Sequence, residues 1–219
     1  MKILKLITLA ATTALATAAT AQVPAGSQAA VSPAGFSPQP SGGAFTMGFA
    51  FTAATGTYLN GLGAFDYLGD GFSAPVTVGL WNNAGQLLVQ ATVGSSDTLL
   101  DSFRYALVPS YALQAGTTYV VGAFRYAGAG EVYATGFGGS AAPGITFLNA
   151  RYSDSGAFAF PGTSVGTYGY FGANALVGDQ VVRNNAVPEP ATWAMLVVGF
   201  GAVGATVRRR SARVAVRFA

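Results

Sequence analysis

The stretch PVTVGLWNNAGQLLVQATV, residues Pro75–Val93, decides the fold class. Its first part alternates Val76, Val78 and Leu80 with Thr77, Gly79 and Trp81. Alternation with a period of two is typical of a β-strand that buries one face. The turn NNAG at residues 82–85 and the second apolar run behind it predict an antiparallel hairpin.

Short runs of the same kind recur outward from this hairpin, separated by turn residues. The clearest are AFTMGFAFT at 44–52, YLNGLGAFDYL at 58–68, TLLDSFRYALV at 98–108 and TTYVVGAFRY at 117–126. EVYATGF, GITFLNARYS, GTYGYFGA and NALVGDQVV follow them. No segment before the C-terminal tail shows sustained helical periodicity. The sequence therefore predicts an all-β fold, an antiparallel β-sandwich of jelly-roll type over residues 44–183.

The composition excludes several kinds of chemistry. The 219 residues include no cysteine and no histidine, which rules out disulfides, thiol catalysis, histidine-bound metals and any triad with an imidazole base. Residues 22–187 carry four arginines and seven acidic residues, a net charge of −3. Because this region has no basic cluster, we expect no nucleic-acid partner.

The N-terminus has the three parts of a secretory signal peptide. Lys2 and Lys5 form a positive start, an apolar run follows from Ile3 to about Ala16, and Ala19–Ala21 fits a cleavage site. We expect residues 1–21 to direct export through the inner membrane. Residues 22–43, rich in Ala, Pro, Ser and Gly, are predicted to be a flexible segment before the β-domain.

The C-terminus carries a second apolar run. Residues 191–207 contain no charge and would extend roughly 25 Å as a helix, at the lower end for a membrane span. Trp193 lies near one end and Arg208 begins a basic cluster at the other. These features predict one transmembrane helix that anchors the exported protein in the inner membrane, with a basic cytoplasmic tail at 208–219.

The glycines in this run also fit a nucleotide-binding fingerprint. Gly199, Gly201 and Gly204 have the spacing G-x-G-x-x-G. That motif requires a preceding strand, and an acidic residue about 20 positions later. No acid follows Glu189, so we expect no nucleotide to bind here.

The order of motifs in the tail resembles the PEP-CTERM sorting signal of Gram-negative bacteria. Pro188, Glu189 and Pro190 match its name motif, within a linker at 184–190. The run WAMLVVGF from Trp193 to Phe200, which includes Gly199, and the cluster Arg208, Arg209 and Arg210 match the rest. The resemblance implies a substrate of exosortase, cut near the PEP motif and passed to the cell surface or released. Such proteins are commonly linked to exopolysaccharide and biofilm. The alternative is a simple tail anchor with a chance PEP sequence.

A second resemblance covers part of the body. The order of LGAFDYLGDGF, PVTVGLWNNAGQLLVQATV, FRYALV and LQAGTTYVVGAF is similar to DUF4082-type domains. This resemblance extends from Ala44 to about Tyr126 and implies a β-sandwich module of secreted bacterial proteins, with no settled activity.

The acidic residues offer two candidate sites. Asp66 and Asp70, in FDYLGDG, could bind Ca²⁺ with neighbouring carbonyls, or could simply form a solvated turn. Pairs drawn from Asp97, Asp101, Glu131 and Asp154 could form a glycosidase couple, but none lies in a diagnostic motif. We therefore expect no enzyme, no metal and no other cofactor.

The aromatic residues offer a third candidate site. Trp81, at a strand end, is the ring that we expect to be exposed for ligand binding. Six tyrosines at strand ends or in Gly-rich loops could stack on sugars or could pack as ordinary core residues: Tyr111, Tyr126, Tyr133, Tyr152, Tyr168 and Tyr170. We expect a structural or adhesive protein of the cell surface or extracellular matrix. The alternative is an exopolysaccharide-binding module.

Overall fold

The computed structural model describes residues 22–40, 42–126, 128, 130–136, 139–166, 169–181 and 190–211. The chain divides into two units, residues 1–181 and 182–219. In the described part, the first unit consists of strands joined by turns and the second contains one helix.

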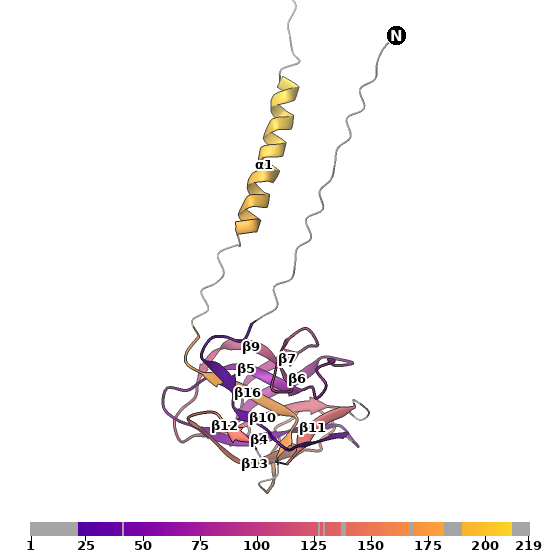
Figure 1. The fold of residues 1–219 in the computed structure, drawn as a ribbon, viewed down its shortest axis with the longest axis vertical. Helices are drawn as coiled ribbons and strands as arrows, with labels where there is room; N and C mark the ends of the chain where they lie inside the picture. The colour runs from indigo at the N-terminus through magenta and orange to yellow at the C-terminus, as the bar shows by residue number, and fades with distance from the viewer. Residues whose placement is uncertain are drawn as a thin grey trace, which may run out of the picture. The chain divides into compact units, whose positions relative to one another are not determined.

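Two antiparallel sheets form the first unit and pack as a sandwich (Figure 1). The five-stranded sheet has the order β1 (Ser27–Ala29), β16 (Ala173–Gly178), β5 (Tyr58–Phe65), β9 (Phe103–Ala112), β8 (Thr98–Leu100). The six-stranded sheet has the order β14 (Thr163–Val165), β13 (Ile145–Ser153), β4 (Phe45–Ala53), β10 (Thr118–Arg125), β6 (Val76–Asn82), β7 (Leu87–Val93). The predicted all-β sandwich is confirmed.

Two small sheets flank the main ones. One has the order β15 (Tyr170–Phe171), β11 (Glu131–Thr135), β3 (Ser37–Pro40), and the other pairs β12 (Ser140–Ala141) with β2 (Val31–Ser32). Both are antiparallel, and the pairs β3–β11 and β2–β12 join segments about 100 residues apart in the chain.

The predicted hairpin at 75–93 forms from β6 and β7. Val76 pairs with Val93 and Leu80 with Val89, and the register shifts by one residue between Leu80 and Trp81. Gly85 closes the turn at a φ of 83°, a backbone conformation that glycine adopts without strain. The alternation of the first strand therefore sets both its pairing and the face that it turns to the core.

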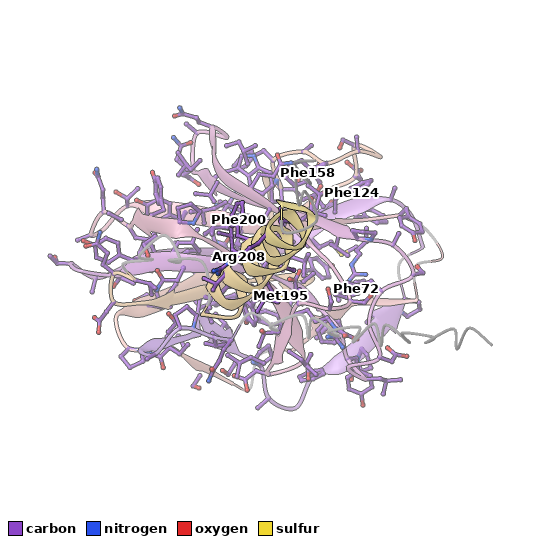
Figure 2. The ribbon with its side chains drawn as sticks, turned by 90° about the horizontal axis from the view of Figure 1, so that it is seen from above. Phe72, Phe124, Phe158, Met195, Phe200 and Arg208 are labelled. Carbon is purple, nitrogen blue, oxygen red and sulfur yellow. The ribbon has the colours of Figure 1, made fainter. Side chains whose placement is uncertain are left out.

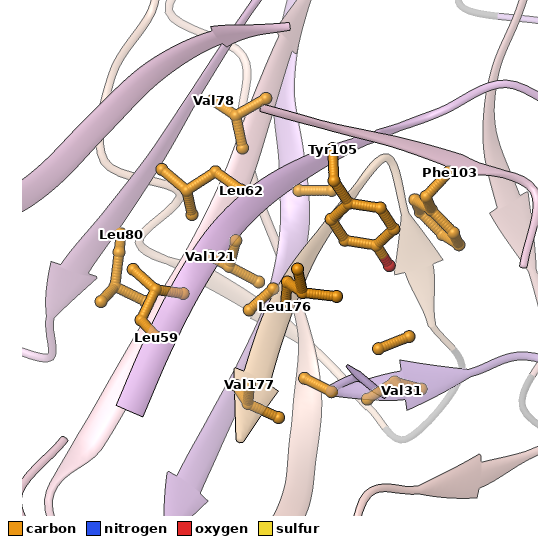
Figure 3. Close-up of a cluster of buried hydrophobic side chains, with 14 of the residues drawn as sticks. Val31, Leu59, Leu62, Val78, Leu80, Phe103, Tyr105, Val121, Leu176 and Val177 are labelled. Atoms are coloured by element: carbon orange, nitrogen blue, oxygen red, sulfur yellow. The ribbon is translucent and has the colours of Figure 1, made fainter. Parts of the chain in front are cut away.

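The core lies between the two main sheets. Leu59, Leu62 and Leu176 of the five-stranded sheet gather with Val78 and Val121 of the six-stranded sheet (Figure 3). These side chains are fully buried. Burial of apolar surface at about 25 cal/mol per Å² is the main force that holds the sheets together in a chain without disulfides.

The segment predicted to be flexible, residues 22–43, instead contributes β1, β2 and β3 to three different sheets. Val31 is fully buried, and its backbone bonds the side chain of Asn174. The Asn174 amide accepts from Val31 N at 3.3 Å and donates to Val31 O at 2.6 Å. A polar side chain on β16 thus completes the backbone pairing of a segment with little apolar sequence of its own.

The second unit contains α1, Pro190–Ser211. Its large apolar side chains between 195 and 203, including Met195 and Phe200, are exposed along the helix (Figure 2). No helix in the described residues is long and apolar enough to cross a membrane, so the span predicted over 191–207 is not found. Gly199, Gly201 and Gly204 interrupt the run and add no side chain to its apolar surface.

Candidate functional site

Three tyrosines from three strands converge at one edge of the sandwich. The ring of Tyr170 on β15 lies edge to face against Tyr133 on β11, with centroids 5.4 Å apart. It also lies edge to face against Tyr152 on β13, at 6.2 Å. All three rings are only partly buried. Tyrosines that meet this way present apolar faces and hydroxyl groups together.

These rings line a cavity of about 300 Å³, which we call the tyrosine groove. Strand pairing places them there, because Tyr152 pairs with Met47 on β4 while Tyr170 pairs with Thr135 on β11. The remaining lining residues are Gly42, Phe45, Met47 and Val165. The groove is thus formed where the small sheet with β11 and β15 meets the six-stranded sheet.

The groove is uncharged. None of the described residues that line it is acidic or basic. Burial, and to a lesser degree the neighbouring Tyr170, raises the pKa of Tyr133 above its ordinary value of 10.0. The Tyr133 phenol therefore remains neutral at physiological pH. The site can stack on a ligand and exchange hydrogen bonds, but its described lining offers no acid–base pair.

The other tyrosine candidates do not join the groove. Tyr111 packs against the hydrophobic core, and Tyr126 shares a 2.9 Å hydrogen bond with Ser73. Tyr168 lies outside the described residues. Tyr133, Tyr152 and Tyr170 are each evident from the sequence as separate candidates. Their convergence is not, because only long-range pairing brings their strands together.

Asp66 does not have the surroundings of a calcium ligand. Its side chain is 3% exposed and bonds the guanidinium of Arg104, with Nε 2.5 Å from Oδ2. The same oxygen accepts a hydrogen bond from Gly71 N. Asp70 is exposed in the same loop. In the described residues no three side chains of a metal-binding type come together. Asp66 does form the predicted turn, through Gly69 N and Gly71 N, but its carboxylate is buried in an ion pair rather than solvated.

The expectation that Trp81 is exposed is wrong. The residue is only 3% exposed, and its ring packs on Phe158 with centroids 5.1 Å apart. A Cβ atom at Gly79 would lie within 2.6 Å of the Trp81 ring. Because glycine has no side chain, the ring has room to pack against the backbone at this position. Gly122 pairs with Gly79 on the adjacent strand and widens that space. Trp81 is a packing residue of a second, smaller core.

The sorting residues predicted in the tail are described only in part. Pro188 and Glu189 lie outside the described residues. Pro190 is the first residue of α1, a position suited to proline because its missing N–H has no partner there in any helix. Trp193, Gly199, Arg208, Arg209 and Arg210 all lie within α1, and Arg208 is exposed.

A β-sandwich followed by a helix that begins at a PEP motif and ends in arginines defines a sorted, exported domain. The chain belongs to the DUF4082 family, a domain of unknown function, which matches residues 30–172. Residues 186–210 match the PEP-CTERM protein-sorting motif. This motif implies an exported, surface-associated protein that exosortase processes. No curated protein and no solved structure matches the chain.

The family match also corrects the extent of the resemblance. It begins before Ala44 and continues past Tyr126, so it includes β2, β3 and the strands β11, β13 and β15. All three tyrosine-bearing strands, β11, β13 and β15, fall in the part that the shorter resemblance left out. All three groove tyrosines lie inside the matched domain.

Proposed function

We propose that this protein is an adhesive module of the cell surface or extracellular matrix, which binds exopolysaccharide through the tyrosine groove. The observation that carries this is the convergence of Tyr133, Tyr152 and Tyr170 on one open cavity. Aromatic rings suit the apolar faces of sugar rings, and phenol groups suit their hydroxyls. The proposal joins the sorting motif, which implies export, to a site suited to an extracellular polymer.

The proposed role is binding without catalysis. Two of the acids considered for a glycosidase couple, Asp97 and Asp101, accept structural hydrogen bonds. Asp97 accepts from Gly94 N at 2.7 Å, and Asp101 accepts from the Ser32 hydroxyl at 2.8 Å. The groove itself has no carboxylate among its described lining. These contacts support a module that holds a glycan rather than cleaves it.

Cosedimentation of the purified full-length protein with exopolysaccharide from its native host tests this function. Tyr152→Ala and Tyr170→Ala should each weaken binding about tenfold, because each removes a stacking face from the groove. Tyr58→Ala is the matched control, since Tyr58 is also partly buried but lies outside the groove. Equal binding by all three variants would exclude the groove as the binding site for exopolysaccharide. No binding by the unaltered protein would leave a structural role alone.

A further inference from the structure

A second cavity lies under the loop at 66–73 and is larger than the tyrosine groove. Its volume is about 430 Å³. Its lining combines the rings of Tyr67 and Phe72 with the polar groups of Asp70, Ser73 and Arg125. We call it the arginine cavity.

The loop above this cavity is held firmly in place. Arg104 bonds Asp66 and also donates from Nη2 to Gly69 O at 2.6 Å. Ser95 makes two hydrogen bonds with the backbone of Phe72, accepting from its N–H at 2.8 Å and donating to its carbonyl at 3.0 Å. A wall fixed in this way loses little conformational entropy when a ligand binds.

Arg125 is an unusual residue at the base of this loop. It is 5% exposed, and its guanidinium lies 4.5 Å from the centroid of the Phe72 ring. Its one hydrogen bond among the described contacts runs from Nη2 to Phe65 O at 2.6 Å, and its buried Nε has no partner there. No described carboxylate forms a salt bridge with it. Buried charges are normally paired, so this one lacks its usual anion.

The charge of Arg125 persists despite burial. Desolvation lowers the pKa of Arg125 to about 10, against an opposing effect of nearby Asp66. The guanidinium therefore stays protonated at neutral pH. Because Arg104 compensates the charge of Asp66, Arg125 attracts a negative group locally, and the Asp70 carboxylate at the same cavity partly opposes this attraction.

We propose that the arginine cavity binds an acidic sugar, a hexuronate residue, whose carboxylate pairs with Arg125. Arginine and carboxylate form strong, charge-assisted hydrogen bonds, and such a pair would supply the missing anion. Asp70 and the Ser73 hydroxyl are placed at the same cavity to bond sugar hydroxyls, and Tyr67 offers a ring face that is 41% exposed. The choice of a sugar over another carboxylate rests on the proposed function.

Calorimetric titration of the purified full-length protein with a free hexuronate monosaccharide tests the proposal. The parallel titration uses the neutral hexose of the same configuration. We expect the hexuronate to bind at least tenfold more tightly than the hexose, with weakening as salt rises. A monosaccharide does not need the tyrosine groove, so Tyr170→Ala should bind it normally. A negative result for glycan binding at the tyrosine groove is thereby distinguished from a negative result for hexuronate binding at the arginine cavity.

Two variants test the role of the cavity independently. Arg125→Met removes the charge and keeps a long apolar side chain, and Arg151→Met is its control in another part of the domain. Ser73→Trp acts from an exposed position and fills the cavity mouth, so it keeps the test valid if Arg125→Met does not fold. Loss of hexuronate binding in either cavity variant, but not in the control, is expected. Equal affinity for both sugars, no hexuronate binding, or full binding by Ser73→Trp would overturn the proposal.

Discussion

The Asp66 carboxylate and the Arg104 guanidinium form a buried ion pair across 38 residues of sequence, with Nε 2.5 Å from Oδ2. Arg104 also bonds the carbonyls of Gly69 and Asp97, so one side chain ties together two loops. Asp66, the candidate calcium ligand, therefore belongs to the hydrogen-bond network that holds the loop lining the arginine cavity.

Removal of one partner from this pair should destabilise the fold. Asp66→Asn leaves the Arg104 charge buried without compensation, and we expect the free energy of unfolding to fall by about 3 kcal/mol. Urea unfolding measures this loss. Asp70→Asn, in the same loop but exposed, should change stability by no more than about 0.5 kcal/mol. Similar stability of the two variants would contradict the account.

Trp81 should matter for stability rather than for ligand binding. Its ring is buried against Phe158 and over Gly79. Trp81→Ala should cost about 3–5 kcal/mol in unfolding free energy through the cavity that it leaves. Polysaccharide binding, measured where the variant is still folded, should equal that of the unaltered protein. A folded variant that had lost binding would show that Trp81 belongs to the site after all.

The buried Tyr105 hydroxyl should make the folded protein less stable at alkaline pH. This hydroxyl is buried without a partner among the described residues, and burial, with a smaller effect of Asp101, raises its pKa well above the ordinary 10.0. Above pH 10 the unfolded chain ionises this phenol but the folded protein does not, so stability falls as pH rises. Tyr105→Phe should make that fall smaller. It should also keep or slightly raise stability at neutral pH, because it removes an unpaired polar group. Thermal unfolding from pH 7 to 11 checks both statements, and an unchanged alkaline fall would contradict them.

Processing can be read from the intact mass of the protein from its native host, with membrane and medium analysed separately. We expect a released species that begins at Gln22 and ends near Pro188–Pro190, as the two terminal motifs predict. A membrane species that retains Arg208–Ala219, with nothing released, would contradict processing of the tail.

Local sequence patterns predicted the strands that carry their own apolar alternation. The hairpin of β6 and β7 formed where the alternation placed it, and Arg104 lies on the opposite face of β9 from Phe103. The tail motif was also evident, because its parts occur in a fixed order within about 30 residues. These features depend on neighbours in sequence.

Long-range contacts decided the features that the sequence could not reveal. The Val31 segment is polar and rich in turn residues, and it becomes structure because Asn174, 143 residues away, bonds its backbone. Trp81 is covered by a loop more than 70 residues later in the chain. The groove tyrosines were all candidates, but their meeting depends on strand order, which no local pattern encodes.

The central claim, that a glycan occupies the tyrosine groove, is tested most directly by NMR of the protein with isotope-labelled tyrosine rings. Oligosaccharides from the native exopolysaccharide are the titrant. The account predicts saturable shifts of the ring signals of Tyr133, Tyr152 and Tyr170, assigned by single Tyr→Phe variants, while Tyr58 stays unchanged. Binding without any shift in these three rings, or shifts confined to other tyrosines, would contradict it.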